Sequence, residues 1–234
     1  MTKINLTGTI VPNEDKWIYD EFGIAATSPQ DISEALDNAE DDVTVLINSG
    51  GGDLFAGNEI YYLLHESEKN ITADITAFAA SAATVAACGA SHVRANPGAQ
   101  YMIHCVSTWG AEGNHADFEK MAEILQEADR AVADVYELKT GLDRKELLSL
   151  MESEKWMDAK EALSYGFIDE IIGAEESIPS GARFFNSISP VLSTETIARF
   201  KDRLLNPYAG KDHNTDFLTR QRHINLLQLK GGQK

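Results

Sequence analysis

The chain has 234 residues, of which 43% are hydrophobic and 24% charged, a composition typical of a soluble globular protein with one main core. Its formal net charge of −17 argues against nucleic acid as a partner, because phosphate binding needs clustered Lys and Arg. No apolar run reaches the ~18 residues of a transmembrane helix, so we expect no membrane insertion. With two cysteines and no signal-peptide pattern, we expect a cytoplasmic protein.

The charge changes sign along the chain. Residues 1–175 carry 11 Lys and Arg against 32 Asp and Glu, whereas residues 176–234 carry 9 against 5. We therefore predict a main domain over 1–175 and a C-terminal extension over 176–234 that is partly helical or flexible. Within the extension, weak amphipathic patterns predict helices over 193–205 and 215–229.

The first half of the chain alternates between strand-like and helix-like segments. An alternating strand is expected over 4–10, and Ser28 followed by Pro begins a helix. The apolar run 43–47 is typical of a strand buried on both faces, and a Gly-rich turn over 48–53 should follow it. A helix, another strand and an Ala-rich helix come next. This repeated βαβ order predicts an α/β fold with a mainly parallel sheet.

The second half adds one unusually long helix. Apolar residues at helical spacing predict it over 115–140, ended by Gly141. Because some 25 residues is long for a compact domain, part of this helix should project and pack against another subunit. The other expected elements are short strands over 91–94 and 100–104, a helix after a capping box at Asp158, and a closing strand over 167–172.

One hydroxyl lies where a strand passes into the Ala-rich helix. Ser81 has two alanines on each side, which leave space for a substrate. Its oxygen would lie near free backbone N–H groups, as a nucleophile needs, but an ordinary helix N-cap explains the residue equally well. A base is available in His104 at the end of a later strand, although such a histidine is often only structural.

Two further features, a run of three glycines and a cysteine next to His104, each have more than one explanation. Gly50-Gly51-Gly52 can present backbone N–H groups to an anion, form half of an oxyanion hole, or serve as a tight turn. It has neither the P-loop nor the dinucleotide-binding spacing. Cys105 follows His104, but adjacent strand residues face opposite ways, so we interpret it as a small buried hydrophobic residue rather than a Cys–His pair.

Four blocks in this order resemble the proteolytic subunit of the Clp protease over roughly residues 3–174. They are Ile47-Asn48-Ser49-Gly50-Gly51-Gly52, Ala79-Ala80-Ser81-Ala82-Ala83, Met102-Ile103-His104, and Trp156-Met157-Asp158-Ala159-Lys160-Glu161-Ala162 with Tyr165-Gly166-Phe167-Ile168-Asp169. The resemblance implies a crotonase-like α/β fold of repeated βαβ units with a long protruding helix. It also implies serine endopeptidase activity on peptides or unfolded chains, without a metal or other cofactor, in homo-oligomeric heptameric or stacked rings.

Carried over by position, the resemblance assigns roles to five residues. Ser81 is the expected nucleophile, His104 the general base, and the backbone N–H groups of Gly51 and Ala82 the oxyanion hole. The third triad member falls on Glu154, where the family usually has Asp; Asp158 is the rival, although capping already accounts for it.

Two departures from the family indicate a particular branch. We expect the segment that docks the Clp ATPase to be missing before the first strand, and the tail is long. Both resemble the Clp-like proteases of phages and prophages, which would imply prohead maturation by cleavage of scaffold and capsid proteins in the host cytoplasm. The alternatives are Clp-type protein turnover, a crotonase-like acyl-CoA enzyme, and a catalytically silent ring subunit.

Overall fold

The computed structural model describes residues 1–173. The predicted extension 176–234, with its helices over 193–205 and 215–229, lies outside the described residues, so that division of the chain stays a prediction. None of the helices within residues 1–173 is both long and apolar enough to cross a membrane.

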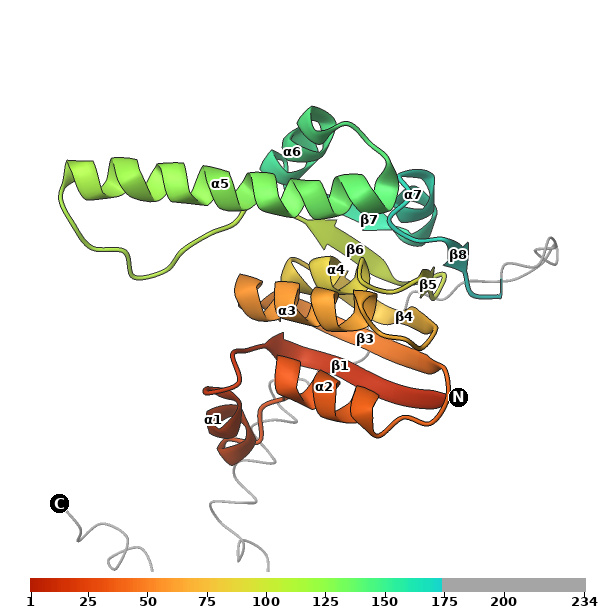
Figure 1. Ribbon diagram of the computed structural model, residues 1–234. Helices are drawn as coiled ribbons and strands as arrows, with labels where there is room; N and C mark the ends of the chain where they lie inside the picture. Colours follow the sequence, from red (N-terminus) through yellow and green to blue (C-terminus); the bar gives the residue numbers. More distant parts are fainter. Residues whose placement is uncertain (174–234) are drawn as a thin grey trace, which may run out of the picture. The chain divides into compact units, whose positions relative to one another are not determined.

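The described residues alternate between strands and helices (Figure 1). The strands are β1 (Thr2–Ile10), β2 (Ala26–Thr27), β3 (Val43–Gly52), β4 (Ile71–Ala80), β5 (His92–Ala95), β6 (Gln100–Ile103), β7 (Lys155–Asp158) and β8 (Glu170–Ile171). The helices are α1 (Lys16–Glu21), α2 (Pro29–Asp37), α3 (Leu54–His65), α4 (Ala82–Ala87), α5 (His115–Thr140), α6 (Arg144–Glu152) and α7 (Ala159–Ser164).

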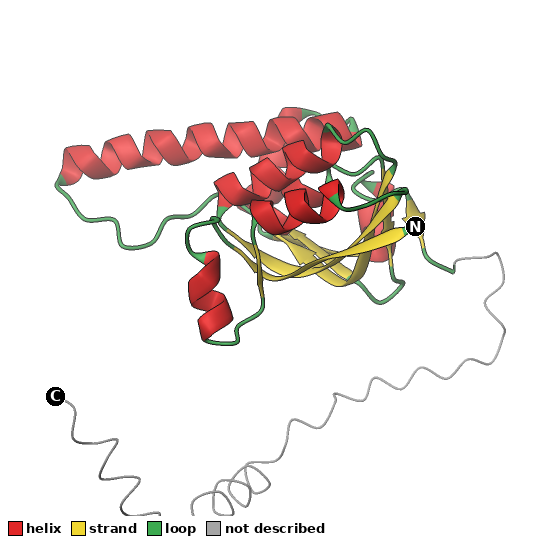
Figure 2. Cartoon of the chain, turned by 60° about the horizontal axis from the view of Figure 1, so that its bottom comes forward, coloured by secondary structure: helices red, strands yellow, loops and turns green. Residues whose placement is uncertain are grey.

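The sheet is mainly parallel, which confirms the predicted α/β fold. Strands β2, β1, β3, β4, β5 and β8 lie in that order, and every neighbouring pair among them is parallel. Helices pack against one face of the sheet (Figure 2). The antiparallel exception within residues 1–173 is β7, which pairs with β6.

Strand β4 pairs with two different strands, one along each half, and we call this arrangement the fork in β4. Its first half, Thr72–Ile75, pairs with β5, whereas Phe78–Ala80 pairs with β6. Ala80 at the end of β4 lies opposite Met102, close to the end of β6. Because parallel strands bring their carboxyl ends to the same edge, the residues that follow β4 and β6 become neighbours although they are more than twenty positions apart in sequence.

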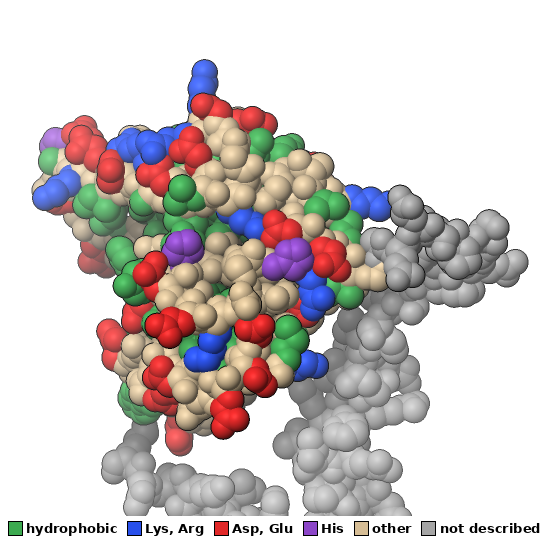
Figure 3. Space-filling view, turned by 45° about the vertical axis from the view of Figure 1, so that its right-hand side comes forward, with side chains coloured by type: hydrophobic (Ala, Val, Ile, Leu, Met, Phe, Trp, Pro, Cys, Tyr) green, Lys and Arg blue, Asp and Glu red, His purple; other side chains and the backbone are tan. Residues whose placement is uncertain are grey.

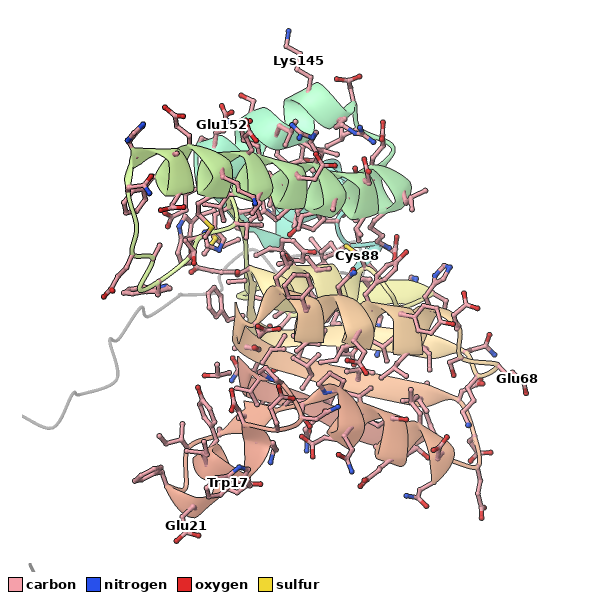
Figure 4. The ribbon with its side chains drawn as sticks, turned by 60° about the vertical axis from the view of Figure 1, so that its left-hand side comes forward. Trp17, Glu21, Glu68, Cys88, Lys145 and Glu152 are labelled. Atoms are coloured by element: carbon pink, nitrogen blue, oxygen red, sulfur yellow. The ribbon has the colours of Figure 1, made fainter. Side chains whose placement is uncertain are left out.

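The core joins the sheet to a close-packed pair of helices. All six residues of α4 are buried, since alanine side chains let the helix approach its neighbours closely. A Cβ added at Gly57 of α3 would lie 2.8 Å from the Cβ of Ala82. Cys88, directly after α4, lies where the α3–α4 layer meets α5 (Figure 4).

Two predicted boundaries were wrong. β3 does not end at Ile47 but continues to Gly52, because Gly51 and Gly52 pair with the end of β1. The closing strand predicted over 167–172 is only Glu170–Ile171, and Phe167 before it is a buried core residue. Glycine is depleted in strands, so the sequence pattern predicts a turn at a Gly-rich segment, and only the pairing with β1 shows that this one is strand.

The long helix has the predicted bounds. Asn114 forms a capping box with Asp117 at the start of α5, and Gly141 ends it in the left-handed conformation. Its buried residues all lie in the last three turns, whereas Phe118 and Ile124 are about half exposed. Figure 1 shows the first half of α5 extending well beyond the sheet.

The surface matches the acidic composition of this part of the chain. In Figure 3, acidic side chains are spread over the visible face and lie among the Lys and Arg side chains. Partly buried Arg94, for example, makes a bidentate contact with Asp74 at 2.7 and 2.8 Å. Its positive charge is therefore matched within the sheet.

Candidate active site

Ser81 occupies a strained turn between β4 and α4. Its backbone has φ 56° and ψ −129°, a conformation that residues with a Cβ rarely adopt. The Ser81 N–H donates to the carbonyl of Met102 at 2.9 Å, and the Thr84 N–H donates to the Ser81 carbonyl at 2.9 Å. The turn is therefore held from β6 on one side and from α4 on the other.

The Ser81 hydroxyl is paired with His104. Its Oγ lies 2.8 Å from His104 Nε2, and it makes no capping hydrogen bond to α4. Ser81 therefore occupies the N-cap position of α4, as the sequence allowed, but its side chain does not cap the helix. His104 directly follows β6, so the fork in β4 is what brings the two side chains together. A serine and a histidine in this contact can act as nucleophile and base.

Gly51 and Ala82 both lie at this turn. A Cβ added at Gly51 would be 2.6 Å from the Ala80 carbonyl oxygen and 2.7 Å from the Ser81 Cβ, so only glycine fits. The Gly51 N–H, however, donates to Ser49 Oγ at 3.1 Å. It is therefore already paired in this conformation. Gly52, to which the resemblance assigned no role, lines the same cavity as Ser81 and Ala82.

Glu154 directly precedes β7, as His104 directly follows β6. The last registered pair of these antiparallel strands is Ile103 with Lys155, so the two residues flank the same end of the β6–β7 pairing. Glu154 is exposed, and its Oε1 accepts a hydrogen bond from the indole of Trp156 at 3.3 Å. Among the described residues, the hydrogen bond of the His104 ring is the one to Ser81.

The backbone of Glu154 is unusual in the same way as that of Ser81. With φ values of 49° and 56°, these are the two non-glycine residues of the described part that have positive φ. Strained residues concentrate at functional sites. The rival Asp158 pairs with Gln100, four positions from His104, which is about 13 Å along a strand. Its Oδ1 caps α7 by accepting from the Glu161 N–H at 2.8 Å.

A cavity of about 380 Å³ opens beside the Ser81–His104 pair. Its walls beyond the pair are mostly apolar and come from the start of α3, from α4 and from α5. They include Leu54, Phe55, Val85, Met121, Ile124, Leu125, Ala128 and Val132. Such a hollow can take a large apolar side chain next to the reactive hydroxyl.

Cys105 packs against the core as predicted, but it is only partly buried and also lines this cavity. The chain after Ile103 is no longer strand, and the alternation of faces does not extend to this position. Burial, with a contribution from the Asp129 carboxylate, raises the pKa of the Cys105 thiol to about 11. The thiol is therefore neutral near pH 7 and a poor nucleophile.

Sequence reasoning also missed how the segment after His104 is anchored. The Val106 N–H donates to Asp129 Oδ1 on α5 at 2.6 Å. The signal for this contact was an acidic residue at helical spacing from Leu125 and Val132, on the apolar face of the helix. Within residues 1–173, no three His, Cys, Asp or Glu side chains are close enough together to hold a metal ion.

Known proteins match this chain over the part that carries the site. The family described as Clp protease matches residues 32–175. The ATP-dependent Clp protease proteolytic subunit of Streptococcus mutans is 33% identical over 146 residues, covering 61% of this chain and 74% of the relative. Subunit 2 from Nocardia farcinica is 34% identical over 140 residues, covering 58% and 68%.

A solved structure has the same fold. A mutant of ClpP1 from Listeria monocytogenes aligns with a TM-score of 0.59 at 20% identity, over 73% of this chain and 90% of that one. The fold of this chain is therefore a known one. From the extent of the family match, the chain belongs to the Clp protease family.

Proposed function

We propose that this protein is a serine endopeptidase acting on peptides and unfolded polypeptides. The observation that carries the proposal is the 2.8 Å contact between Ser81 Oγ and His104 Nε2 at the mouth of an apolar cavity. Membership of the Clp protease family supports a peptidase role. A crotonase-like acyl-CoA activity fits less well, because it would leave the Ser–His pair without a task.

In the proposed mechanism, Ser81 Oγ attacks the scissile carbonyl carbon while His104 Nε2 takes the hydroxyl proton. His104 then gives this proton to the leaving amine, and the peptide bond breaks to leave an acyl group on Ser81. Water, deprotonated by His104, attacks the acyl carbonyl and restores the serine. The tetrahedral oxyanion would accept hydrogen bonds from the Ala82 N–H and from Gly51 or Gly52.

Gly51 needs a change of partner before it can take this role. Its N–H must leave Ser49 Oγ and turn toward the substrate oxygen. Gly52 lines the cavity already and is the alternative donor. Because the three glycines carry no side chains, a small backbone rotation can exchange these N–H groups.

Glu154 is the proposed orienting acid. It directly precedes Lys155, the partner of Ile103, and its carboxylate would have to leave Trp156 to reach the free ring nitrogen of His104. Asp158 is disfavoured because it lies at the far end of β7 and caps α7. The extra methylene of Glu relative to Asp gives the carboxylate the reach that this rotation needs.

For the biological role we favour Clp-type protein turnover. The relatives reported above are named ATP-dependent Clp protease proteolytic subunits, which supports a ring-forming peptidase assisted by an ATPase. The exposed first half of α5 offers a surface for contact between subunits. Cleavage of phage scaffold or capsid proteins in a prohead stays a prediction from the sequence alone.

The test is hydrolysis of fluorogenic peptides that differ at the cleaved residue. We expect cleavage after large apolar residues such as Leu or Phe, slower cleavage after Asp or Lys, and none by Ser81→Ala. Native mass measured on both proteins checks that the variant assembles as the wild type does. Equal hydrolysis by the two proteins would refute Ser81 as the nucleophile.

A further inference from the structure

A buried polar network lies beneath the nucleophile turn. Thr84 Oγ1 donates to the Ser81 carbonyl oxygen at 2.5 Å and lies 2.6 Å from the hydroxyl of Tyr136. Thr84 is 0% exposed and Tyr136 is 1% exposed. These three residues, which we term the Tyr136–Thr84–Ser81 network, connect α5 to the backbone of the turn.

The direction of each hydrogen bond follows from the count of protons. A threonine hydroxyl has one hydrogen, and a carbonyl oxygen can only accept, so the hydrogen of Thr84 points to the Ser81 carbonyl. Tyr136 must therefore donate to Thr84 Oγ1. Burial raises the pKa of Tyr136 far above its ordinary value, which keeps this donor protonated.

The network acts on a backbone that needs support. Ser81 has φ 56°, and its carbonyl accepts from both the N–H and the hydroxyl of Thr84. Without the Tyr136 hydroxyl, Thr84 Oγ1 accepts no hydrogen bond in a buried site, and the Thr84 side chain can rotate to find another donor. A loosened Ser81 carbonyl lets the turn relax and moves Oγ away from His104.

We propose that Tyr136 is a positioning residue for the nucleophile: through Thr84, its hydroxyl holds the Ser81 turn in the strained conformation that directs Oγ at His104. Tyr136 also packs edge-on against Phe167, with ring centroids 5.3 Å apart, so Phe can replace it without opening a cavity. The catalytic consequence rests on the proposed peptidase function, whereas the effect on the turn does not.

The chain offers a matched control in Tyr101. It is 2% exposed, packs against the same Phe167 at 5.1 Å, and its hydroxyl donates to the Thr84 backbone carbonyl at 3.3 Å rather than to the Thr84 side chain. Tyr101→Phe therefore removes an equally buried hydroxyl from the same cluster but leaves the support of the Ser81 carbonyl intact.

The experiment compares Tyr136→Phe, Tyr101→Phe, Thr84→Val and Thr84→Ser in the full-length protein. With a fluorogenic peptide we expect Tyr136→Phe and Thr84→Val to lower kcat ~10-fold or more, with KM within about twofold, because a misplaced nucleophile slows the chemical step. Thr84→Ser keeps the hydroxyl and should keep kcat. The double variant Tyr136→Phe/Thr84→Val should be no slower than Thr84→Val alone, since both break one network.

Amide hydrogen exchange over residues 81–85 gives a readout that needs no activity. We expect exchange in this segment to be several-fold faster in Tyr136→Phe than in wild type or Tyr101→Phe. Equal exchange and equal kcat in the two phenylalanine variants would overturn the positioning role. If the wild type hydrolyses no peptide, the proposed function fails, and the exchange comparison still decides whether Tyr136 holds the turn.

Discussion

Ser81 and Glu154 both have positive φ, but they are held very differently. The Ser81 turn is fixed by hydrogen bonds to Met102 and Thr84, within the buried junction of β4, β6 and α4. Glu154 follows α6 at the surface, where its N–H donates to the Met151 carbonyl at 3.0 Å and its carboxylate contacts Trp156. One half of the site is therefore rigid, and the other half can be rearranged.

This difference indicates how activity can be regulated within one fold. Ser81 and His104 are placed by strand pairing, which forms whenever the sheet forms. The proposed acid depends on a side chain that must change partner from Trp156 to His104. We therefore expect the acid side to respond to assembly or substrate, while the Ser81–His104 contact stays constant.

The largest effect that separates the two halves should come from Glu154→Gln. If Glu154 orients His104, peptide hydrolysis should fall by up to ~10⁴-fold, as when a triad acid is replaced by its amide. Asp158→Asn is the matched control, and its rate should stay within about twofold of wild type. Steady-state kinetics on both variants decide the assignment. A large loss in Asp158→Asn with normal turnover in Glu154→Gln would reverse it.

The reactivity of the two cysteines toward an alkylating reagent tests the environments that the structure assigns to them. Cys105 lines the cavity beside Ser81, whereas Cys88 does not. Because the pKa of Cys105 is raised to about 11, its alkylation by iodoacetamide at pH 8 should be ~100-fold slower than that of an ordinary thiol of pKa 9. Its rate should climb with pH until about 11. Cys88, whose pKa burial raises to about 12, should stay unlabelled in the folded protein. Rapid labelling of Cys105 at neutral pH would contradict the assigned environment.

Gly51→Ala should distort the Ser81 turn, which belongs to the rigid half of the site. The new Cβ would meet the Ala80 carbonyl, the Ser81 Cβ and the Ala82 N at 2.6–2.8 Å, at a φ of +86°. We expect a loss of about 1–3 kcal/mol in the free energy of unfolding. Urea denaturation measures it, with Gly98→Ala as the control because a Cβ there meets nothing within 4 Å. Equal stability of the two variants would show that the turn tolerates a side chain.

The smallest expected effect is a change in stability at Glu154, in the half of the site that can be rearranged. Glu154→Gly removes the strain at φ 49°, whereas Glu154→Ala keeps it, and both remove the carboxylate. The glycine variant should be more stable than the alanine variant by up to ~1 kcal/mol. Both should lose activity. A glycine variant that is no more stable would mean that the backbone at Glu154 carries no strain.

The sequence predicted the parts of this site that are local. Ser81 and His104 each end a strand-like run, and the long helix has clear periodicity with a cap at Asn114 and a stop at Gly141. The fork in β4 could not be predicted, because it depends on which strand pairs with each half. That pairing is a tertiary choice with no signal in the strand itself.

The polar residues around Ser81 were missed for a related reason. Thr84 lies in a run of alanines, and nothing in the sequence singles it out, yet it is the polar side chain of a wholly buried helix. A buried hydroxyl needs a partner, and its partner Tyr136 lies 52 residues later. The sequence shows that Thr84 is polar, but only the fold shows that Tyr136 is its partner.

The central claim, that Ser81 and His104 form one reactive pair, is tested most directly by fluorophosphonate labelling with peptide mapping. The wild type should carry a single adduct on Ser81, and His104→Gln should form it at least ~100-fold more slowly. An adduct at another residue, or equal labelling rates in the two proteins, would contradict the account.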